Sequence, residues 1–464
     1  MFRIANHHIS RRVSLLLLAE IAVFILSVYA GAKIRFLNEA NAFSQFDNFF
    51  VSACLFAFAM IMSMSALGLY QIQFNDRFRT TVLRLMPSFA LGFCLVIVAF
   101  YIAPGFGFGR GILSLVFAFA SVGVLITRFV FIKTSQLDLF ESRVLFLGCG
   151  PLAKACSDVA TSNTTTHKYD VVGFVNAGLE EASVTSETIL PKDGSLLDTV
   201  RKYNVAEVVV AVQNRREGRL PIQELLECKL SGIRVTDSAA FFEREACQIR
   251  VDSLLPSWLV FGSGFDQSSI RLFVKRAFDL FASLVLAIVV LPISLLTALI
   301  IYCEDRGPIF YRQERVGKDG RIYKVLKFRS MRNDAERAGK PQWATKNDPR
   351  TTRIGTIIRK LRIDEIPQIV NVIKGEMSFV GPRPERPYFV DQLREQIPYY
   401  DVRHSIKPGI TGMAQVRYPY GASVEDAVKK LQYDLYYVKN NSLFLDILIL
   451  IDTIQVVLLG KGAR

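Results

Sequence analysis

The chain has few of the residues that hold structural metals or carry out acyl transfer. Its seven cysteines form no C-x-x-C pair and have no histidine partner at metal-binding spacing, so we expect reduced structural thiols and no zinc site. Only four histidines occur, at positions 7, 8, 167 and 404, and a Ser-His-Asp hydrolase therefore has no support. Charged residues make up only 21% of the chain, which argues against disorder and against an ordinary soluble enzyme.

The chain is instead rich in long apolar runs. Hydrophobic residues make up 51% of the 464 residues. Four runs, at 13–32, 49–70, 84–103 and 112–132, are each near the length of about 20 residues that crosses a bilayer. We therefore expect residues 1–134 to form four transmembrane helices. No small-residue cleavage site follows the first run, which indicates a retained anchor rather than a removed signal.

Basic residues flank these runs unevenly, and the bias predicts the orientation. They are concentrated before the first run (Arg3, Arg11, Arg12), between the second and third (Arg77, Arg79) and around the end of the fourth (Arg128, Lys133, Arg143). This places the N-terminus and everything after residue 133 in the cytoplasm. Glu20 lies inside the first run, either as a functional carboxylate or as the partner of another residue of the bundle.

Residues 141–262 alternate between strand and helix patterns, which predicts a Rossmann-like α/β domain with a parallel sheet. Gly148 and Gly150 follow the first predicted strand and could cradle a diphosphate at a helix N-terminus. However, the second strand ends at Asn176, where a dinucleotide site needs an acidic residue for the ribose. The sequence leaves open whether this domain is structural or senses a nucleotide.

Residues 268–464 open with an apolar run at 277–302 that is long enough to cross a membrane. Crossing would export a strongly basic segment, against the usual bias, and Pro292 interrupts helical hydrogen bonding in the middle of the run. We therefore expect a re-entrant helix over about 273–303 that bends near Pro292 and returns to the cytoplasmic face. A kinked fifth span is the alternative.

Four basic stretches follow, and they would be either solvated faces or phosphate clamps. They are Gly307–Gly317, Lys327–Arg332, Arg359–Gln368 and Gly381–Arg386. The net charge of +14 likewise suits an anionic partner, and we expect no nucleic acid among the partners.

Asp364 and Glu365 form an acidic pair within the third stretch. Pro367 and the apolar spacing of Ile366, Ile369, Val370 and Ile373 predict a helix that ends at Gly375, with Asp364 at its N-terminus. Asp364 could simply cap that helix. The same geometry would also keep a carboxylate ionised as a nucleophile, and Glu365 could hold Mg²⁺ together with substrate phosphates.

Six blocks of this region stand in an order that resembles the bacterial polyprenyl-phosphate phosphoglycosyl transferases. The blocks are Lys275–Asp279, Gly307–Gly317, Lys327–Met331, Asp364–Gln368, Gly381–Pro384 and Pro408–Gly412. With four spans and an α/β domain upstream, the chain resembles the large form of that family, which initiates exopolysaccharide, capsule or O-antigen repeats.

The resemblance implies a reaction and a set of site residues. Asp364 would attack the sugar-linked phosphorus of a UDP-sugar, UMP would leave, and undecaprenyl phosphate would then take the phosphosugar from the aspartyl enzyme. Glu365 would bind Mg²⁺ and Arg383 a phosphate, while Arg359, Lys327 and Arg329 would be substrate or structural contacts. The re-entrant helix would anchor the C-terminal mixed α/β catalytic domain, and a homodimer is expected.

Two other functions compete with this one. A membrane-anchored NAD-dependent epimerase or dehydratase of nucleotide sugars would need a Tyr-x-x-x-Lys pair within 141–262, and none is present. Tyr323 and Lys327 have that spacing, but they lie outside that domain in a stretch that alternates like a strand. A non-catalytic regulator of polysaccharide assembly would use Asp364 only as a cap.

Overall fold

The structure is a computed structural model, and it divides the chain into two compact units, His8–Ala246 and Cys247–Arg464, with short N-terminal pieces assigned to each. The described residues are 2–4, 7–9, 11–36, 49–70, 78–107, 109–135, 142–162, 169–176, 181–191, 194–212, 220–251, 264–265, 267–332, 350–418, 421 and 423–458. Two short N-terminal strands, β1 (Phe2–Ile4) and β2 (His7–Ile9), pair with each other.

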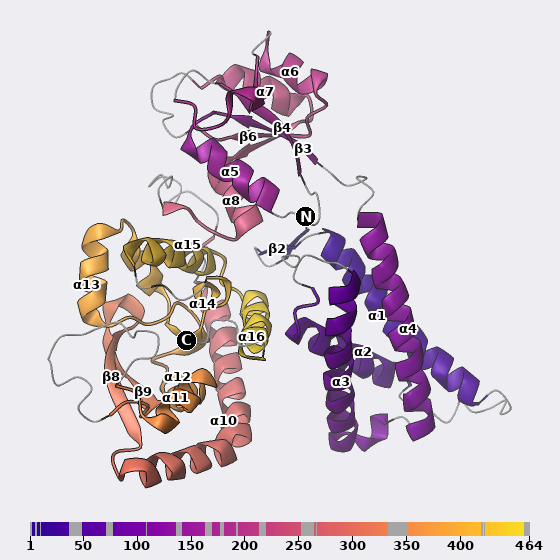
Figure 1. Cartoon of the computed structure of the whole chain (residues 1–464), viewed down its shortest axis with the longest axis vertical. Helices are drawn as coiled ribbons and strands as arrows, with labels where there is room; N and C mark the ends of the chain where they lie inside the picture. The colour runs from indigo at the N-terminus through magenta and orange to yellow at the C-terminus, as the bar shows by residue number, and fades with distance from the viewer. Residues whose placement is uncertain are drawn as a thin grey trace. The chain divides into compact units, whose positions relative to one another are not determined.

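The first unit begins with four long apolar helices that pack side by side (Figure 1). They are α1 (Arg11–Arg35), α2 (Phe49–Ala66), α3 (Phe78–Ile102) and α4 (Arg110–Ser135), with a 3₁₀ turn, η2 (Pro104–Phe106), before α4. All four are long and apolar enough to cross a membrane, which confirms the predicted membrane segment. Gly31 contacts Val116 and Gly123 contacts Val23, so small residues let α1 and α4 approach closely.

Glu20 is fully buried in this helical part and forms an ion pair with Arg128 of α4. The Glu20 Oε1 to Arg128 Nε distance is 2.7 Å, and the Tyr70 hydroxyl donates to the same carboxylate. Arg128 also donates to the Leu69 carbonyl over 2.9 Å. A charge inside an apolar bundle is tolerated when it is paired in this way, and Glu20 thus ties α1 to α4 and to the end of α2.

The rest of the first unit is an α/β domain around a five-stranded parallel sheet, as predicted. The strands are ordered β5-β4-β3-β6-β7. Their bounds are β3 (Ser142–Leu147), β4 (Tyr169–Val175), β5 (Ile189–Leu190), β6 (Glu207–Val210) and β7 (Arg234–Asp237). The helical elements are α5 (Pro151–Ser162), η3 (Ser186–Thr188), α6 (Leu196–Lys202), α7 (Ile222–Leu230) and α8 (Ser238–Ala246).

Alternate residues of the central strand β3 face opposite layers of helices. Val144 and Phe146 pack with residues of α5 and α8, whereas Leu145 and Leu147 pack with α6 and α7. Strands covered on both faces read as continuous apolar runs, which is the pattern of the 143–147 stretch.

The boundary between the two units falls between Ala246 and Cys247. The predicted domain 141–262 therefore ended too late: Ile249 and Val251 are buried in the core of the second unit, and the Ile249 N–H donates to the Gln432 carbonyl. The predicted end at residue 262 itself lies outside the described residues.

The second unit is built on α10 (Ser269–Asp305), the fifth helix in the described residues that is long and apolar enough to cross a membrane. Pro292 lies within α10, and Figure 1 shows the helix changing direction along its length, as expected where proline removes a helical hydrogen bond. An antiparallel pair follows, β8 (Phe310–Val316) and β9 (Ile322–Phe328), joined by η5 (Lys318–Gly320).

Short elements complete the second unit around one apolar core. They are α11 (Arg353–Lys360), η6 (Ile363–Gln368), α12 (Ile369–Lys374), β10 (Ser378–Val380), α13 (Pro387–Gln396), η7 (Tyr400–Ser405), β11 (Gly409–Thr411), α14 (Met413–Arg417), α15 (Val424–Asn440) and α16 (Leu443–Leu458). Strand β10 pairs in parallel with β11, and core residues such as Val380, Leu435 and Tyr436 are almost fully buried.

Candidate active site

Asp364 and Glu365 lie in η6, a 3₁₀ turn that leads directly into α12. The turn begins after Arg362, whose φ of 59° is left-handed, and α12 ends at Gly375, whose φ is 85°. The helix end at Gly375 was predicted correctly. Asp364 is not the N-cap: it lies one residue inside η6, whose N-cap is Arg362 and receives no side-chain cap hydrogen bond. The capping alternative for Asp364 is therefore wrong.

One side of η6 packs against a small apolar cluster. Ile363 and Ile366 of η6 pack against buried Ile301 of α10, Phe328 of β9 and Ile358 of α11. The turn that carries the acidic pair is thus fixed directly on the C-terminal part of the long apolar helix. Such packing holds a short 3₁₀ segment that has little stability of its own.

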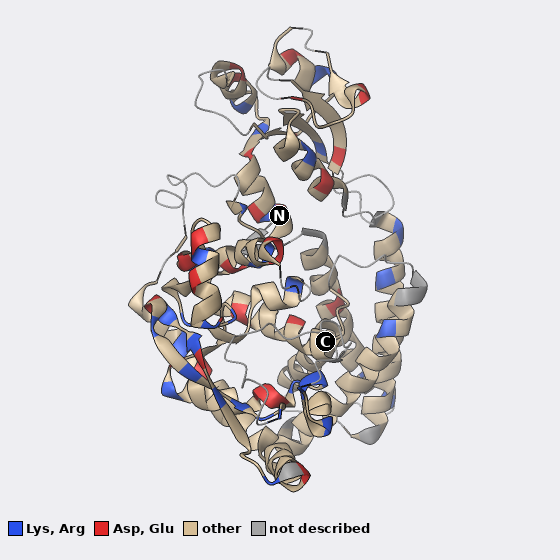
Figure 2. Ribbon diagram, turned by 60° about the vertical axis from the view of Figure 1, so that its left-hand side comes forward, with Lys and Arg blue, Asp and Glu red and all other residues tan. Residues whose placement is uncertain are grey.

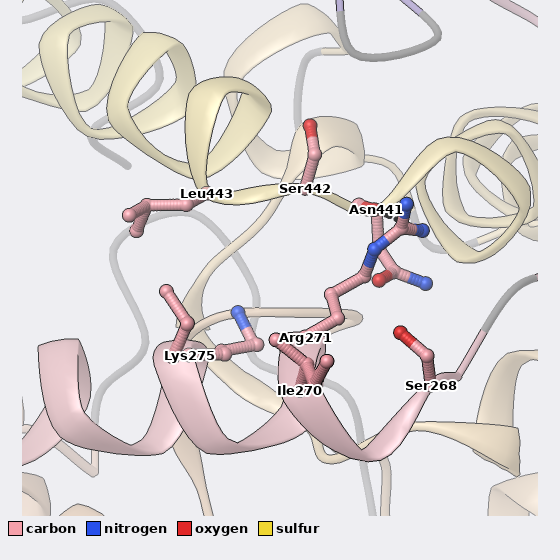
Figure 3. A pocket seen from close by; sticks show the side chains of 8 residues that line it. Ser268, Ile270, Arg271, Lys275, Asn441, Ser442 and Leu443 are labelled. Carbon is pink, nitrogen blue, oxygen red and sulfur yellow. Dashed lines mark hydrogen bonds between the residues drawn. The ribbon is translucent and has the colours of Figure 1, made fainter.

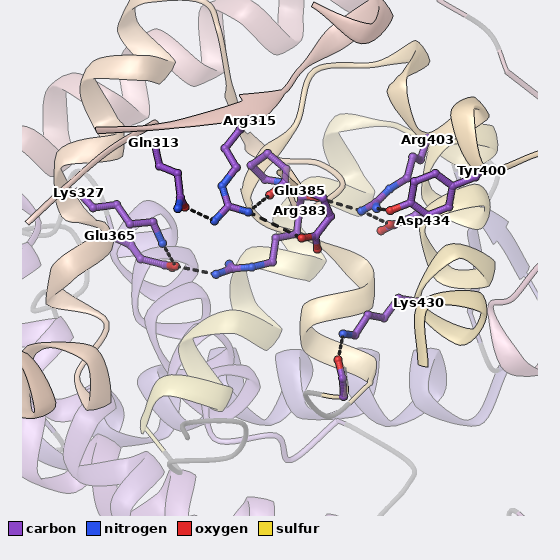
Figure 4. Close-up of polar contacts among 12 residues, drawn as sticks. Gln313, Arg315, Lys327, Glu365, Arg383, Glu385, Tyr400, Arg403, Lys430 and Asp434 are labelled. Carbon is purple, nitrogen blue, oxygen red and sulfur yellow. Dashed lines mark hydrogen bonds and ion pairs between the residues drawn. The ribbon is translucent and has the colours of Figure 1, made fainter. Parts of the chain in front are cut away.

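Two cationic side chains from distant parts of the chain donate hydrogen bonds to the same oxygen of Glu365 (Figure 4). Lys327 Nζ, on β9, lies 2.9 Å from Glu365 Oε1, and Arg383 Nη2, in the loop after β10, lies 3.0 Å from the same atom. Arg362 Nη1 is 4.0 Å from Oε2. Glu365 is only 8% exposed, so these contacts form in an environment that strengthens them.

The charges shift the pKa values of the two carboxyls in opposite directions. Burial alone would raise the pKa of Glu365, but Lys327, Arg383 and Arg362 hold it well below its ordinary value. Burial raises the pKa of Asp364 above its ordinary value, and the charge of Glu365 adds to this, although Lys327 and Arg359 oppose it. Burial lowers the pKa of Lys327, against the attraction of Glu365.

Asp364 keeps its carboxylate available for chemistry. It is 8% exposed, and it accepts no hydrogen bond from the residues that the structure describes. Arg359, in the last turn of α11, contributes only through its charge. A buried carboxylate of raised pKa next to fixed cations can attack an electrophile whose negative charge those cations bind.

Comparisons with known proteins assign the same region to a family. Residues 270–460 match the family described as bacterial sugar transferase. A UDP-glucose:undecaprenyl-phosphate glucose-1-phosphate transferase of Klebsiella pneumoniae is 32% identical over 333 residues, which cover 70% of this chain and 69% of that protein. The chain belongs to the bacterial sugar transferase family. The resemblance found in the sequence is thereby confirmed.

Two further relatives show how far the similarity extends. A UDP-N-acetylgalactosamine-undecaprenyl-phosphate N-acetylgalactosaminephosphotransferase of Aeromonas hydrophila is 43% identical over 240 residues, 52% of this chain and 56% of that protein. The exopolysaccharide production protein PSS of Rhizobium leguminosarum bv. phaseoli is 42% identical over 201 residues, 41% of this chain and 98% of that protein. The shared part therefore spans just over half of the Aeromonas relative.

In this bacterial sugar transferase family member, the structure brings together Asp364, Glu365, Lys327, Arg383 and Arg359. Arg329 is buried, with 6% of its side chain exposed, and a Cβ placed on Gly307 would meet its Nη1 at 1.9 Å. Arg329 thus packs against the turn after α10. Its role as a substrate or structural contact stays a prediction. Arg362 was not among the predicted site residues, although it belongs to the basic stretch that was singled out.

Gly148 of the α/β domain and the Tyr-x-x-x-Lys spacing of β9 have structural explanations. Gly148 has a φ of 122°, and a Cβ there would meet the Ala211 carbonyl oxygen at 2.6 Å, so close packing requires glycine at this position. Nucleotide binding by Gly148 and Gly150 stays a prediction. Tyr323 and Lys327 lie on strand β9, as expected, and Lys327 is occupied by Glu365.

The protein atoms near Asp364 and Glu365 could hold Mg²⁺ only if the substrate supplied the remaining oxygen ligands. The described residues contain no group of three or more His, Cys, Asp or Glu side chains placed to hold a metal ion. Mg²⁺ typically takes one or two carboxylates and fills its remaining positions with phosphate oxygens and water. The Oε2 atom of Glu365 fits the need for one such carboxylate ligand, since Oε1 already contacts Lys327 and Arg383.

A pocket of about 360 Å³ lies between the first turns of α10 and the connection from α15 to α16 (Figure 3). Its lining residues are Ser268, Ile270, Arg271, Val274, Lys275, Asn441, Ser442 and Leu443. None of the predicted site residues lines it. The candidate site is therefore identified by its charges and packing rather than by this pocket.

Proposed function

We propose that the chain is a phosphoglycosyl transferase that moves a sugar 1-phosphate from a UDP-sugar to undecaprenyl phosphate. The products are undecaprenyl-diphospho-sugar and UMP, and the reaction would be the first membrane step of exopolysaccharide, capsule or O-antigen synthesis. One observation carries the proposal: Asp364 and Glu365 lie among four cations on a turn that packs directly on an apolar helix of membrane-crossing length. The names of the relatives support the same substrate classes.

The first half-reaction forms an ester between Asp364 and phosphorus. A carboxylate oxygen of Asp364 attacks the phosphorus that carries the sugar, and the bond from that phosphorus to the UMP oxygen breaks. The electron pair leaves with UMP. Burial disfavours the ionised form of Asp364, which is the form that attacks, and the charges of Lys327, Arg359 and Arg362 oppose that effect.

The second half-reaction returns the enzyme to its starting state. A phosphate oxygen of undecaprenyl phosphate attacks the same phosphorus, the bond from phosphorus to the Asp364 oxygen breaks, and the carboxylate is restored. The energy of the anhydride is conserved, so the protein needs only to position the groups and neutralise charge. Arg383 and Lys327, fixed by Glu365, would bind phosphate oxygens of the donor.

Mg²⁺ would be held by Glu365 together with donor phosphates. When bound, it would neutralise the charge of the diphosphate and of the departing UMP. The Mg²⁺ requirement is therefore part of the proposal, and so is the homodimer that the resemblance implies.

We also propose that α10 is a re-entrant helix and that the second unit lies on the cytoplasmic face of the inner membrane. The bend of α10, Pro292 within it and the basic residues at both of its ends support this arrangement. The β8–β9 pair, with its many Lys and Arg residues (Figure 2), would then face anionic headgroups and anionic substrates. The sugar nucleotide would arrive from water and the lipid phosphate from the bilayer.

The test is Mg²⁺-dependent release of UMP by membranes that contain the full chain. UDP-glucose, UDP-galactose and UDP-N-acetylgalactosamine are supplied in turn with undecaprenyl phosphate. We expect one donor to release UMP and Asp364→Asn to lower that rate by about 10³-fold or more. Asp391→Asn, an exposed carboxylate on α13, is the matched control and keeps the rate. Unchanged turnover in Asp364→Asn, or no release from any UDP-sugar, contradicts the proposal.

A further inference from the structure

Arg383 reaches Glu365 from a loop that has no regular secondary structure. The loop, Gly381–Arg386, follows β10 and precedes α13. Pro382 and Pro384 flank Arg383, and neither has an N–H group to donate. The position of the Arg383 side chain therefore depends on what holds the carbonyl groups of this loop.

Consecutive carbonyl groups from the end of β10 through the loop accept hydrogen bonds from several separate elements. Val380 accepts from Lys275 and Tyr437, Pro382 from the Gly409 N–H, Arg383 from Arg403, Pro384 from Arg315, and Glu385 from the Val316 N–H. These bonds fix the backbone on both sides of Arg383. The contact that holds Arg383 itself comes from a side chain, not from a neighbouring strand.

Arg403 supplies that contact from a buried position in η7. Its Nη2 donates to the Arg383 carbonyl over 2.9 Å and lies 2.8 Å from Asp434 Oδ2 of α15. Its Nη1 donates to the Tyr400 hydroxyl over 2.6 Å. Figure 4 shows this cluster next to the Lys327–Glu365–Arg383 contacts, so the two groups of charges meet at Arg383.

We infer that Arg403, held by Asp434 and Tyr400, is a positioning residue that sets the Arg383 backbone so that its guanidinium reaches Glu365. The inference rests on the proposed function only in taking Arg383 and Glu365 as part of the working site. Arg403 touches neither carboxylate of the acidic pair in the contacts described, and it acts through Arg383.

Burying the Arg403–Asp434 ion pair is costly, which supports a role for Arg403 in aiming a hydrogen bond at the Arg383 carbonyl. Asp434 is 2% exposed and Arg403 is 6% exposed. Taking two charges out of water costs several kcal/mol per ion, and apolar side chains of similar volume often stabilise a fold as well or better. What an apolar replacement cannot supply is a donor aimed at one carbonyl. The Arg403 guanidinium does this from a fixed position, because its Nη1 donates to Tyr400 while its Nη2 contacts both Asp434 and the Arg383 carbonyl.

A double-mutant cycle tests the inference because positioning through Arg383 predicts non-additive effects. The variants are Asp434→Asn and Tyr400→Phe, each made in the full chain and in full-length Arg383→Ala. Asp434→Asn removes the charge but keeps the size, and Tyr400→Phe removes only the hydroxyl. The readout is kcat for UMP release with the UDP-sugar that turns over best, together with the thermal midpoint of each purified variant.

We expect Asp434→Asn to lower kcat by between about tenfold and a hundredfold when Arg383 is present. In Arg383→Ala, the same change lowers kcat less than about twofold, since the group being positioned is gone. Tyr400→Phe shows the same pattern with a smaller loss. Asp401→Asn, a half-exposed carboxylate on the same turn η7, is the matched control and leaves kcat unchanged in both backgrounds.

Equal losses in both backgrounds overturn the inference, because they show that the cluster supports the fold and not Arg383. If Asp434→Asn does not fold, Tyr400→Phe decides alone by the same criterion. Failure of the proposed function looks different: Asp364→Asn and Arg383→Ala would then both keep full activity, whatever the Asp434 and Tyr400 variants do.

Discussion

At the scale of single residues, the site separates the roles of two adjacent carboxyls. Lys327 and Arg383 share one oxygen of Glu365, whereas Asp364 accepts no hydrogen bond within the part of the chain that the structure describes. The pKa of Glu365 is lowered and that of Asp364 is raised. Carboxyls whose environments push their pKa values apart suit different tasks. In the proposed mechanism, Glu365 is a fixed anion that organises cations and Asp364 is the nucleophile.

Replacing Glu365 tests its organising role. Glu365→Gln keeps the shape but leaves Lys327 buried without its countercharge, so we expect the free energy of unfolding to fall by about 3 kcal/mol and the rate of UMP release to fall with it. Thermal unfolding of the purified chain and the UMP assay measure the two effects. Glu314→Gln, an exposed residue on the neighbouring strand β8, should change neither. A Glu365→Gln variant as stable and active as the parent chain would refute this role.

We expect His404 to make the second unit sensitive to acid. Burial, reinforced by Arg403, lowers the pKa of His404 to about 4, although Asp401 opposes the shift. Between the unfolded pKa of about 6.5 and this value, the unfolded chain takes up a proton that the folded chain does not. Stability is thus lost as the pH falls below about 6.5, by up to about 3 kcal/mol from this group.

The variant His404→Gln should flatten that dependence. We expect its thermal midpoint to fall less than that of the parent chain between pH 7 and pH 4.5, as measured by thermal unfolding in detergent. Parallel pH curves for the two chains would show that His404 does not titrate in this way. The His404 ring also packs edge-on against the Tyr400 ring, at a centroid distance of 6.0 Å.

At the scale of elements, the η6–α12 segment explains why the acidic pair has a fixed place. The sequence predicts one helix from its apolar spacing, and the structure splits it into a 3₁₀ turn and a short α-helix. Pro367 lies inside the turn and cannot donate a hydrogen bond, so the α-helical pattern begins only at Ile369. The segment is too short to be stable alone, and its ends must be held by other elements.

Arg276 holds the C-terminal end of this segment. Its Nη1 and Nη2 donate to the carbonyls of Val372 and Ile373 over 2.6 and 2.7 Å, at the end of α12 where carbonyls have no helical partner. We expect Arg276→Gln to lower the free energy of unfolding by about 2 kcal/mol, as measured by thermal unfolding. Lys374→Gln removes the same charge from an exposed residue at this helix end and should cost much less. If both variants lose the same free energy of unfolding, Arg276 stabilises the end of α12 through its charge and not through its hydrogen bonds.

Local patterns predicted the elements of the site, but not the contacts between them. Apolar runs, the strand around Lys327 and the end of α12 at Gly375 follow from spacing along the chain. The contacts of Glu365 with Lys327 and Arg383 join residues 38 and 18 positions apart, and no local rule specifies them. The burial of Arg329 next to Gly307 is likewise a contact that its place in a basic stretch does not indicate.

At the scale of the whole molecule, the long helix α10 decides where the proposed chemistry takes place. A helix of 37 residues could cross a bilayer in one pass, but the cluster of Ile301, Ile358 and Ile363 fixes its C-terminal part to the turn that carries Asp364. Arg276 and Asp279 connect its N-terminal part to α12 and β10 of the same unit. Both parts of α10 thus contact the same domain, as a helix that enters and returns requires.

Cysteine labelling tests this topology. In a version of the chain without its seven native cysteines, Phe310→Cys places a thiol at the half-exposed start of β8. We expect a membrane-impermeant maleimide to label it in inverted vesicles and not in intact cells. Gly105→Cys, in the loop that the charge pattern places outside, should show the reverse. Labelling of residue 310 from outside would establish a fifth span and reject the re-entrant helix.

Mass spectrometry of quenched enzyme tests the covalent step most directly. The full-length protein is mixed with Mg²⁺ and the UDP-sugar that it turns over, without undecaprenyl phosphate, then quenched and digested. The account predicts a peptide containing Asp364 heavier by the mass of the sugar phosphate, which disappears when the lipid acceptor is added before quenching. An enzyme that turns over in the complete assay but never shows this adduct on Asp364 would contradict it.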